Sequence, residues 1–242
     1  MELVSNYAIS VSDLSVQYFS NAKSIFTKNK QTGVNALKSI SFDVNKGETI
    51  AILGKNGAGK TTLLRAIGGF LRPASGTVQT FGRVFILKGA NPGLISHISP
   101  RKNVRILGEI YGISKIERER FEKEVEDFCE LGSAYDRDFS TLSSGMAGRV
   151  GFGFTTSLNP EILLMDETLG VGDIEFRKKA EKKAMEFMER GETILLSTHS
   201  LNLAKSMCVR GLVLDDGKLV FDGSSEDAVA YYLENIIHIN KK

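Results

Sequence analysis

Several features that mark particular classes of protein are missing from this chain of 242 residues. It has only two cysteines, Cys129 and Cys208, in no metal-binding spacing, and it does not open with a signal peptide, so we expect a reduced, cytoplasmic protein. No apolar run approaches the roughly 18 residues that cross a membrane. The formal net charge is only +2, which provides no field favouring nucleic acid as a partner.

The remaining composition, 42% hydrophobic and 25% charged, is that of a globular protein with one large domain or two lobes. Residues 8–18 alternate between apolar and polar side chains and are predicted to form a strand. Residues 34–54, "VNALKSISFDVNKGETIAILG", are predicted to form a hairpin and a buried strand, with "NKGE" as the turn. The segments "TIAIL", "EILLMDE" and "TILLST" are apolar on both faces, which is typical of parallel strands. Their alternation with helical segments predicts an α/β protein.

Helices are expected after Gly59, over Ser114 to Gly132, over "IEFRKKAEKKAMEFMER" and over "SEDAVAYYLENI" near the end, which follows a hairpin around "DDGK". In the second of these, "SKIE" is a capping box and Phe121, Val125 and Phe128 recur on one face. Residues 88–115 read as short of regular structure. The expected lobes are a core and β lobe, about 1–87 and 159–242, and a helical lobe, about 100–158.

The stretch "GKNGAGKTT" matches the phosphate-binding pattern G-x-x-x-x-G-K-[ST] between an apolar strand and a helix. Its glycines let backbone N–H groups converge on phosphate oxygens, and the helix N-terminus adds partial positive charge. Lys60 would reach the β- and γ-phosphates, and the Thr61 hydroxyl would bind Mg²⁺. A chance glycine-rich turn is the alternative, which the strand–loop–helix context disfavours. The predicted ATP-binding residues are Gly54, Lys55, Asn56, Gly57, Ala58, Gly59, Lys60, Thr61 and Thr62.

Two further segments carry candidate catalytic groups. "ILLMDE" ends in Asp166, predicted to bind Mg²⁺, and Glu167, predicted to orient or deprotonate the attacking water. An apolar strand ending in two acids is common by itself, and the pairing with the phosphate loop is what favours this role. His199 lies 32 residues after Glu167, at the end of the next predicted strand, and so on the same sheet edge. A structural role is its alternative, and a hydrogen bond to the γ-phosphate is the favoured one.

Together, "GKNGAGKTT", "LSSGM", "ILLMDE", "GVGD" and "THS" fall in the order found in ABC transporter nucleotide-binding subunits, which the chain resembles over about residues 8–235. The resemblance implies a P-loop NTPase with a RecA-like core, an N-terminal antiparallel β subdomain and a helical subdomain. It implies ATP and Mg²⁺ as ligands, a head-to-tail homodimer, and an integral membrane permease subunit in two copies. It also implies a peripheral location at the cytoplasmic face of the bacterial inner membrane, and no nucleic-acid partner.

The resemblance also assigns residues. Ser143, Ser144, Gly145 and Met146 match the signature loop, which caps the ATP of the partner subunit. Ser143 and Gly145 would meet the γ-phosphate by hydroxyl and backbone N–H, and the following helix "MAGRVGFGF" would point its positive end there. Asp173 matches the D-loop aspartate at the dimer seam. Tyr18 is the candidate to stack on adenine, with the adjacent Phe19 as the alternative.

Departures from the family pattern point to a subfamily. The signature reads Leu-Ser-Ser-Gly-Met instead of Leu-Ser-Gly-Gly-Gln, the D-loop reads "TLGVGD", and residues 88–100 contain no glutamine where the family has one. A long insertion, "SSGM" and "DETLGVGD" together resemble the ATPases of polysaccharide exporters, which move O-antigen, capsule or teichoic acid chains. The chain resembles the short form, without a C-terminal carbohydrate-binding domain, and the polysaccharide would be an indirect substrate.

Alternatives stay open at this point. The chain could be the ATPase of another transporter, for a lipid, drug or nutrient, or a non-transport ABC ATPase, although no coiled coil or basic tail is visible. Residues 88–115, with Arg101, Lys102 and Arg105, are the candidate surface for the membrane subunit, or else a solvated loop. The basic insertion 20–33 is a solvated loop or a segment that faces anionic headgroups.

Overall fold

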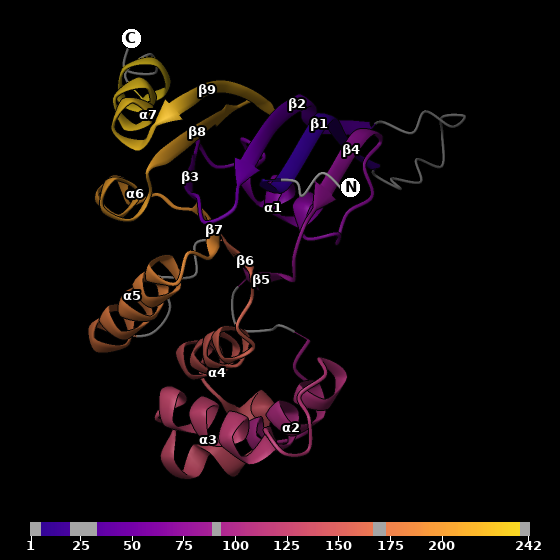
Figure 1. Ribbon diagram of the computed structural model, residues 1–242, viewed down its shortest axis with the longest axis vertical. Helices are drawn as coiled ribbons and strands as arrows, with labels where there is room; N and C mark the ends of the chain where they lie inside the picture. Colours follow the sequence, from indigo (N-terminus) through magenta and orange to yellow (C-terminus); the bar gives the residue numbers. More distant parts are fainter. Residues whose placement is uncertain (1–5, 20–32, 89–92, 167–172, 238–242) are drawn as a thin grey trace, which may run out of the picture. The chain divides into compact units, whose positions relative to one another are not determined.

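The computed structural model describes residues 6–19, 33–88, 93–166 and 173–237, and all structural statements concern these residues (Figure 1). Glu167 and most of the insertion 20–33 lie outside them, as does part of the segment where the family glutamine was expected. The chain divides into two compact units, which are described separately. The first unit comprises residues 1–82 and 193–242, and the second comprises residues 83–192.

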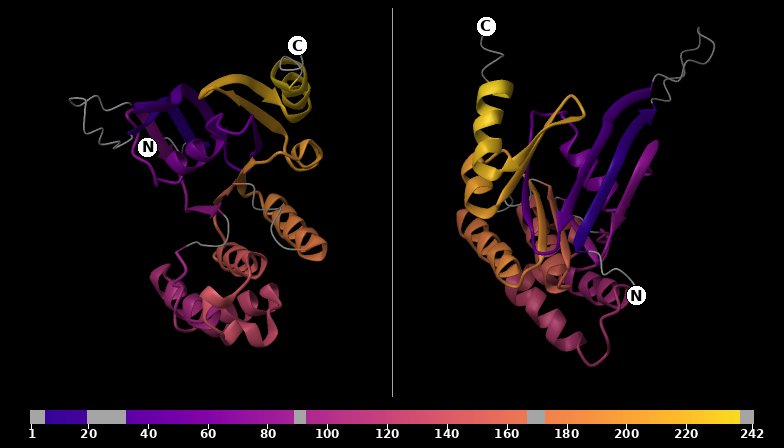
Figure 2. Two further views of the ribbon diagram at one scale, coloured as in Figure 1. Left: turned by 180° about the vertical axis from the view of Figure 1, so that it is seen from behind. Right: turned by 45° about the horizontal axis from the view of Figure 1, so that its top comes forward.

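The first unit contains a three-stranded antiparallel sheet in the order β2–β1–β4 (Figures 1 and 2). Its strands are β1 Tyr7–Phe19, β2 Gly33–Asn45 and β4 Ser75–Thr80. Strand β1 confirms the strand predicted over residues 8–18. The predicted hairpin through "NKGE" is wrong, because β2 pairs with β1 and the strand after the turn belongs to another sheet. Alternation along the sequence indicated the strands but not their partners.

The central strand β3, Thr49–Leu53, lies between β7, Thr193–Ser197, and β8, Arg210–Asp215, and runs parallel to both. All five residues of β3 and of β7 are buried, as their two apolar faces predict. Strand β9, Lys218–Ser224, is antiparallel to β8, which confirms the hairpin at "DDGK". The pairing of Ile52 with Ser197 brings the carboxyl ends of β3 and β7 to one edge.

Three helices complete this unit, namely α1 Lys60–Ile67, α6 Leu201–Met207 and α7 Ser225–Tyr231. The hydroxyls of Ser200 and Ser224 cap α6 and α7 by accepting from backbone N–H groups three residues on. Helix α7 continues as a π-helical segment, η4 Tyr232–Ile237, so the predicted closing helix is confirmed with a wider last turn.

The second unit pairs β5, Val84–Lys88, in parallel with β6, Ile162–Asp166. Its helices are α2 Pro100–Ile110, α3 Arg118–Cys129, α4 Ser144–Ser157 and α5 Ile174–Glu189, with 3₁₀ turns η1 Gly132–Asp136 and η2 Phe139–Thr141. Helices α2, α3 and α4 lie close together, as Figures 1 and 2 show, and their buried side chains form one apolar core. Members of this core include Val104, Leu107, Phe121, Val125, Val150 and Phe154.

Helix α2 was missed, and the prediction that residues 88–115 lack regular structure is wrong. Ser99 is its N-cap, accepting from the Lys102 backbone N–H, and Pro100 occupies the first turn, where its missing N–H is harmless. Val104 and Leu107 are buried one turn apart. The Ser-Pro pair followed by this spacing was the available signal, and the irregular residues before it obscured it.

Helix α3 begins at Arg118, four residues after the predicted start. The predicted capping-box contacts between Ser114 and Glu117 are nevertheless present, and the Ser114 hydroxyl donates to the Glu117 carboxylate over 2.6 Å. Helix α4 begins at Ser144, two residues before the predicted start, and includes the glycine-rich stretch. A Cβ on Gly153 would lie 3.0 Å from the Phe128 ring and 3.2 Å from Cys129 Sγ, so glycine here permits close packing on α3.

The described residues include no helix that is both long enough and apolar enough to cross a bilayer.

Candidate nucleotide-binding site

The loop between β3 and α1 has a backbone that only glycine tolerates at several positions. Gly54, Gly57 and Gly59 have φ of 155°, 83° and 107°. A Cβ at Gly54 would lie 2.5 Å from the Leu214 carbonyl oxygen, and one at Gly59 would lie 2.8 Å from that of Ala36. The backbone conformation of the predicted phosphate loop and its close neighbours in the first unit therefore require glycine at these positions.

Lys60, the first residue of α1, places its ammonium group against this loop. The side chain is buried, 6% exposed, and Nζ donates to the carbonyl oxygens of Gly54 at 2.8 Å and Lys55 at 3.1 Å. No acidic side chain occupies the first turn of α1 and no side chain caps it. A buried cation beside uncapped helix amides is an arrangement that favours an anion. The arrangement favours phosphate binding by this loop, which stays a prediction.

Two aromatic residues end β1 near α1. The Tyr18 hydroxyl lies 3.4 Å from Thr62 Oγ1, in the first turn of α1, and the side chain is 40% exposed. The Phe19 ring lies instead over Gly33, where a Cβ would be 3.3 Å from Cε1. The contact with α1 favours Tyr18 over Phe19 as the residue that stacks on a base bound at the phosphate loop.

His199 follows β7 and is exposed. Because Ile52 pairs with Ser197, His199 lies at the sheet edge from which the phosphate loop departs. The turn around it is fixed by its neighbours, since the Ser200 N–H donates to Thr198 Oγ1 at 3.0 Å and the Ser200 hydroxyl caps α6. In the first unit, Lys60, Tyr18 and His199 therefore all lie on elements that adjoin the phosphate loop.

Asp166 ends β6 in the second unit, opposite Lys88, and is 9% exposed. Its carboxylate is an oxygen ligand of the kind Mg²⁺ prefers, and its role as an Mg²⁺ ligand stays a prediction. Within the described ranges, no three or more His, Cys, Asp or Glu residues cluster as a metal site. Glu167, the predicted base, directly follows β6 but lies outside the described residues.

The predicted signature residues form the start of α4. Ser143 is the N-cap, and its hydroxyl oxygen accepts from the Met146 N–H at 3.3 Å. Ser144, Gly145 and Met146 make up the first turn, and both serines are exposed. Any anion brought to this end would meet backbone N–H groups and the positive end of a helix. Capping by Ser143 gives this residue a local role that its match to the family did not reveal.

Asp173 also has a local role. It is the N-cap of α5, accepting from the Phe176 N–H at 2.9 Å, and it pairs with the guanidinium of Arg149 on α4. The Phe176 N–H, followed by Arg149, lowers the pKa of the Asp173 carboxyl. The role of Asp173 at a dimer seam stays a prediction. The involvement of Arg149 left no signal in the sequence, because the two residues are 24 positions apart.

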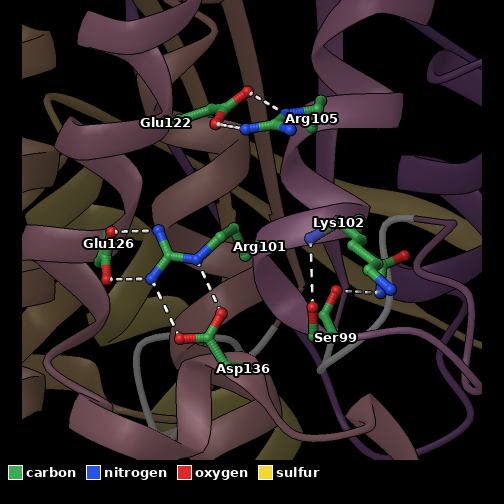
Figure 3. Close-up of polar contacts among 8 residues, drawn as sticks. Ser99, Arg101, Lys102, Arg105, Glu122, Glu126 and Asp136 are labelled. Carbon is green, nitrogen blue, oxygen red and sulfur yellow. Dashed lines mark hydrogen bonds and ion pairs between the residues drawn. The ribbon is translucent and has the colours of Figure 1, made fainter.

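The basic residues of α2 are largely neutralised inside the unit (Figure 3). Arg101 donates to both carboxylate oxygens of Glu126, at 2.7 and 2.6 Å, and to Asp136, and its guanidinium carbon lies 5.1 Å from the Tyr135 ring centroid. Arg105 forms a two-pronged pair with Glu122, both contacts at 2.9 Å. Arg101 and Arg105 are four residues apart on α2, matching Glu122 and Glu126 on α3. These arginines therefore join two helices and are not an unpaired basic surface.

Comparisons with known proteins agree with this geometry. A profile of the ABC transporter family matches residues 37–170. The chain is 38% identical to the O-antigen export system ATP-binding protein RfbB of Myxococcus xanthus, over 84% of this chain and 46% of that protein. It is 34% identical to the teichoic acids export ATP-binding protein TagH of Bacillus anthracis, over 98% and 44%. It therefore spans about half the length of these two relatives. The RfbB of Klebsiella pneumoniae is 34% identical over 81% of this chain and 80% of its own length.

Solved structures confirm the predicted fold class. The ATP-binding subunit of an ABC transporter is 25% identical and superimposes with a TM-score of 0.77, covering 91% of both chains. A dimeric ATP-binding cassette in a post-hydrolysis state, bound to ADP and phosphate, gives a TM-score of 0.76 at 22% identity, covering 90% of this chain and 98% of its own. The second likeness concerns the fold alone.

Proposed function

Because the chain belongs to the ABC transporter family, we propose that it is the ATP-hydrolysing subunit of an exporter for a lipid-linked polysaccharide or teichoic acid. It would work peripherally, at the cytoplasmic face of the bacterial inner membrane. The observation that carries the nucleotide-binding part is the phosphate loop, where strained glycines frame the buried ammonium of Lys60. The names of the relatives support the export part.

In this proposal the β- and γ-phosphates replace the carbonyls of Gly54 and Lys55 as partners of Lys60. Mg²⁺ would be held by the Thr61 hydroxyl and the Asp166 carboxylate, and when bound it neutralises phosphate charge. Glu167 orients or deprotonates the attacking water, and His199 donates a hydrogen bond to the γ-phosphate. Tyr18 stacks on the adenine. Phosphoryl transfer depends chiefly on such positioning and charge stabilisation.

The start of α4 would complete the site of a second copy of the chain. Ser143 and Gly145 offer a hydroxyl and a backbone N–H at the positive end of that helix, with Ser144 and Met146 in the same turn. Asp173 would lie at the seam between the copies. A head-to-tail homodimer then binds two ATP molecules, closes, and reopens on hydrolysis.

Helix α2 is the proposed docking element for the membrane permease, of which we expect two copies. Lys102, Ile106 and Ile110 are spaced four residues apart on one exposed stripe of α2, and Ile110 is 70% exposed. Exposed apolar side chains beside the ammonium group of Lys102 suit a partner helix of mixed character. The proposed docking surface is therefore smaller than the one predicted over residues 88–115, because Arg101 and Arg105 form ion pairs within the second unit.

The alternative hypothesis is that the chain powers transport of a lipid, drug or nutrient instead of a polysaccharide. The relatives that carry polysaccharide-export names match up to 98% of this chain, and this favours the polysaccharide. No feature among the described residues points to a non-transport role. The lobe boundaries, a β lobe with the core and a helical lobe near 100–158, remain part of this proposal.

The nucleotide-binding and hydrolysis steps are tested by two variants. Glu167→Gln should lose about 10²- to 10⁴-fold in turnover, the usual contribution of a general base, while keeping its affinity for ATP. Lys60→Ala should weaken ATP binding itself, measured by isothermal titration. Near-normal turnover in the first variant, or unchanged affinity in the second, contradicts the assigned roles.

The export step is tested in cells. Deletion of the gene should remove one cell-surface glycan and leave its lipid-linked precursor inside the cell. Wild-type protein should restore export, whereas Glu167→Gln should not. A deletion strain with a normal glycan profile and an altered lipid, drug or nutrient phenotype would support the rival transporter.

A further inference from the structure

We propose that the β8–β9 turn, Asp216–Gly217, positions the phosphate loop. Gly217 would then influence the affinity for nucleotide through the loop, without contacting the nucleotide. This rests on the proposed function, because it concerns the same nucleotide site. The turn lies between strands of the first unit, more than 150 residues along the chain from the loop that it supports. No motif in the sequence assigns it a role beyond turn formation.

Two backbone hydrogen bonds join the turn to the site. The Gly217 N–H donates to the Ala58 carbonyl oxygen in the phosphate loop at 3.1 Å, and the Gly217 carbonyl accepts from the Lys38 N–H at 2.8 Å. The Lys38 ammonium also pairs with the Asp216 carboxylate at 2.6 Å. One glycine therefore bridges β2 and the phosphate loop.

The bond to Ala58 has a direct consequence for the next amide. In a planar trans peptide the carbonyl oxygen and the following N–H point in opposite directions. Because the Ala58 carbonyl faces Gly217, the Gly59 N–H faces away from the turn. Gly59 precedes Lys60, and its N–H is among those a phosphate loop offers to its ligand. Gly217 thus orients an amide of the phosphate cradle.

No other residue fits at Gly217. A Cβ there would lie 2.7 Å from the Ala36 carbonyl oxygen and 3.4 Å from Leu37 Cα, and φ is 75°. The same Ala36 oxygen is 2.8 Å from where a Cβ on Gly59 would lie. The β2 backbone is therefore in close contact with both glycines. A methyl group on Gly217 forces the turn, β2 or the loop to move.

Gly217→Ala is the test, and Gly69→Ala is its matched control. Gly69 is in the same unit with an almost identical φ of 76°, but a Cβ there would meet no atom within 4 Å. Both variants carry the same backbone strain, and only Gly217→Ala displaces its neighbours. We expect the dissociation constant and KM for ATP to rise about tenfold in Gly217→Ala, the loss typical of one misplaced hydrogen bond. Gly69→Ala should stay within about twofold of wild type.

The kinetic signature separates positioning from loss of stability. Below the melting transition, Gly217→Ala should keep kcat within about twofold while KM rises, whereas partial unfolding would lower kcat and leave KM unchanged. Equal KM values for the two glycine variants would overturn the inference. Wild-type protein that does not bind ATP would instead overturn the proposed function.

A second measurement needs no variant at Gly217. Hydrogen–deuterium exchange of wild-type protein should show slower exchange in a peptide covering residues 214–219 when ADP is added. Slower exchange is expected because ordering the phosphate loop stabilises its bond to the Gly217 N–H. A peptide around Gly191, in the second unit, is the internal control. Unchanged exchange in the 214–219 peptide at saturating ADP would also overturn the inference.

Discussion

The guanidinium of Arg149 donates to the carboxylate of Asp173, and the same carboxylate caps α5 through the Phe176 N–H. Arg149 also lies over the ring of Phe176, 5.0 Å from its centroid. That ring meets Phe128 and Phe152 edge-on, at 5.5 and 6.1 Å. The helix that starts at the signature residues is thereby tied to the first residue after the segment 167–172.

Replacing Asp173 separates the cap from the ion pair. Asn caps a helix about as well as Asp, but it has no charge to pair with Arg149. Ala can neither cap the helix nor form the ion pair. We expect Asp173→Ala to lower the urea midpoint of unfolding clearly and Asp173→Asn to lower it less. Equal midpoints for the two variants would show that the cap contributes nothing.

The contribution of the Asp173 charge should depend on pH in one direction. Its pKa is lowered in the folded protein, so the stabilisation is fully present above the ordinary value of 3.8 and is lost as pH falls through the lowered value. The stability difference between wild type and Asp173→Asn should therefore be constant near neutrality and vanish in acid. Urea titrations at intervals from neutral pH down to about pH 2 would measure it.

The Arg101 pair should stabilise the second unit more than an ordinary surface pair does. Its two-pronged geometry and the second acid, Asp136, favour it, although the Arg101 side chain is 37% exposed and partly screened. We expect Arg101→Met to cost about 1 kcal/mol of unfolding free energy. Lys123→Met is the control, because the exposed pair of Lys123 with Asp127 should contribute less than about 0.5 kcal/mol. Equal losses would contradict the distinction.

Both thiols should be inert in the folded protein. Burial raises the pKa of Cys129 and of Cys208 to about 12. Ellman's reagent at pH 8 should therefore react slowly with native protein and rapidly once urea unfolds it. Raising the pH to 9 should give little acceleration while the fold persists. Fast stoichiometric labelling of the native protein would contradict this burial.

Gly145→Asp should abolish ATP-driven dimerisation while leaving monomeric ATP binding intact. A carboxylate in the first turn of α4 is tolerated by the helix dipole, so the variant should fold. The same charge would repel a γ-phosphate brought to this turn by a second copy. Size-exclusion chromatography with ATP in the Glu167→Gln background measures the dimer. A dimer that persists with Gly145→Asp would contradict the role of the signature turn.

The phosphate loop and the buried strands could be predicted because their chemistry is local. Glycines that need positive φ, a lysine and a flanking apolar strand all fall within a dozen residues. The same holds for the hairpin at "DDGK" and the capping contacts of Ser114 with Glu117. In each case, the residues that determine the structure are neighbours in the chain.

The features that were missed depend on distant contacts. Nothing near Arg101 in the sequence indicates that Glu126 would neutralise it, so the three basic residues looked like a surface. The partner of β2 likewise depends on which strand the whole sheet offers. The local role of Asp173 required Arg149, and the role of Gly217 required Ala58 and Ala36.

The side-chain amide of Asn103, fully buried in α2, accepts from the Ile95 N–H at 2.6 Å and donates to the carbonyls of Ile95, Ile98 and Ser99. The Phe139 N–H in turn donates to the Ile98 carbonyl at 3.0 Å. Hydrogen bonds through Asn103 and Ile98 therefore link helix α2, the segment 95–99 before it and the η2 turn just ahead of the signature residues. If the permease binds the exposed stripe of α2, we expect this hydrogen-bond network to carry a movement of α2 to that turn, with Asn103 as its central residue and no glutamine involved.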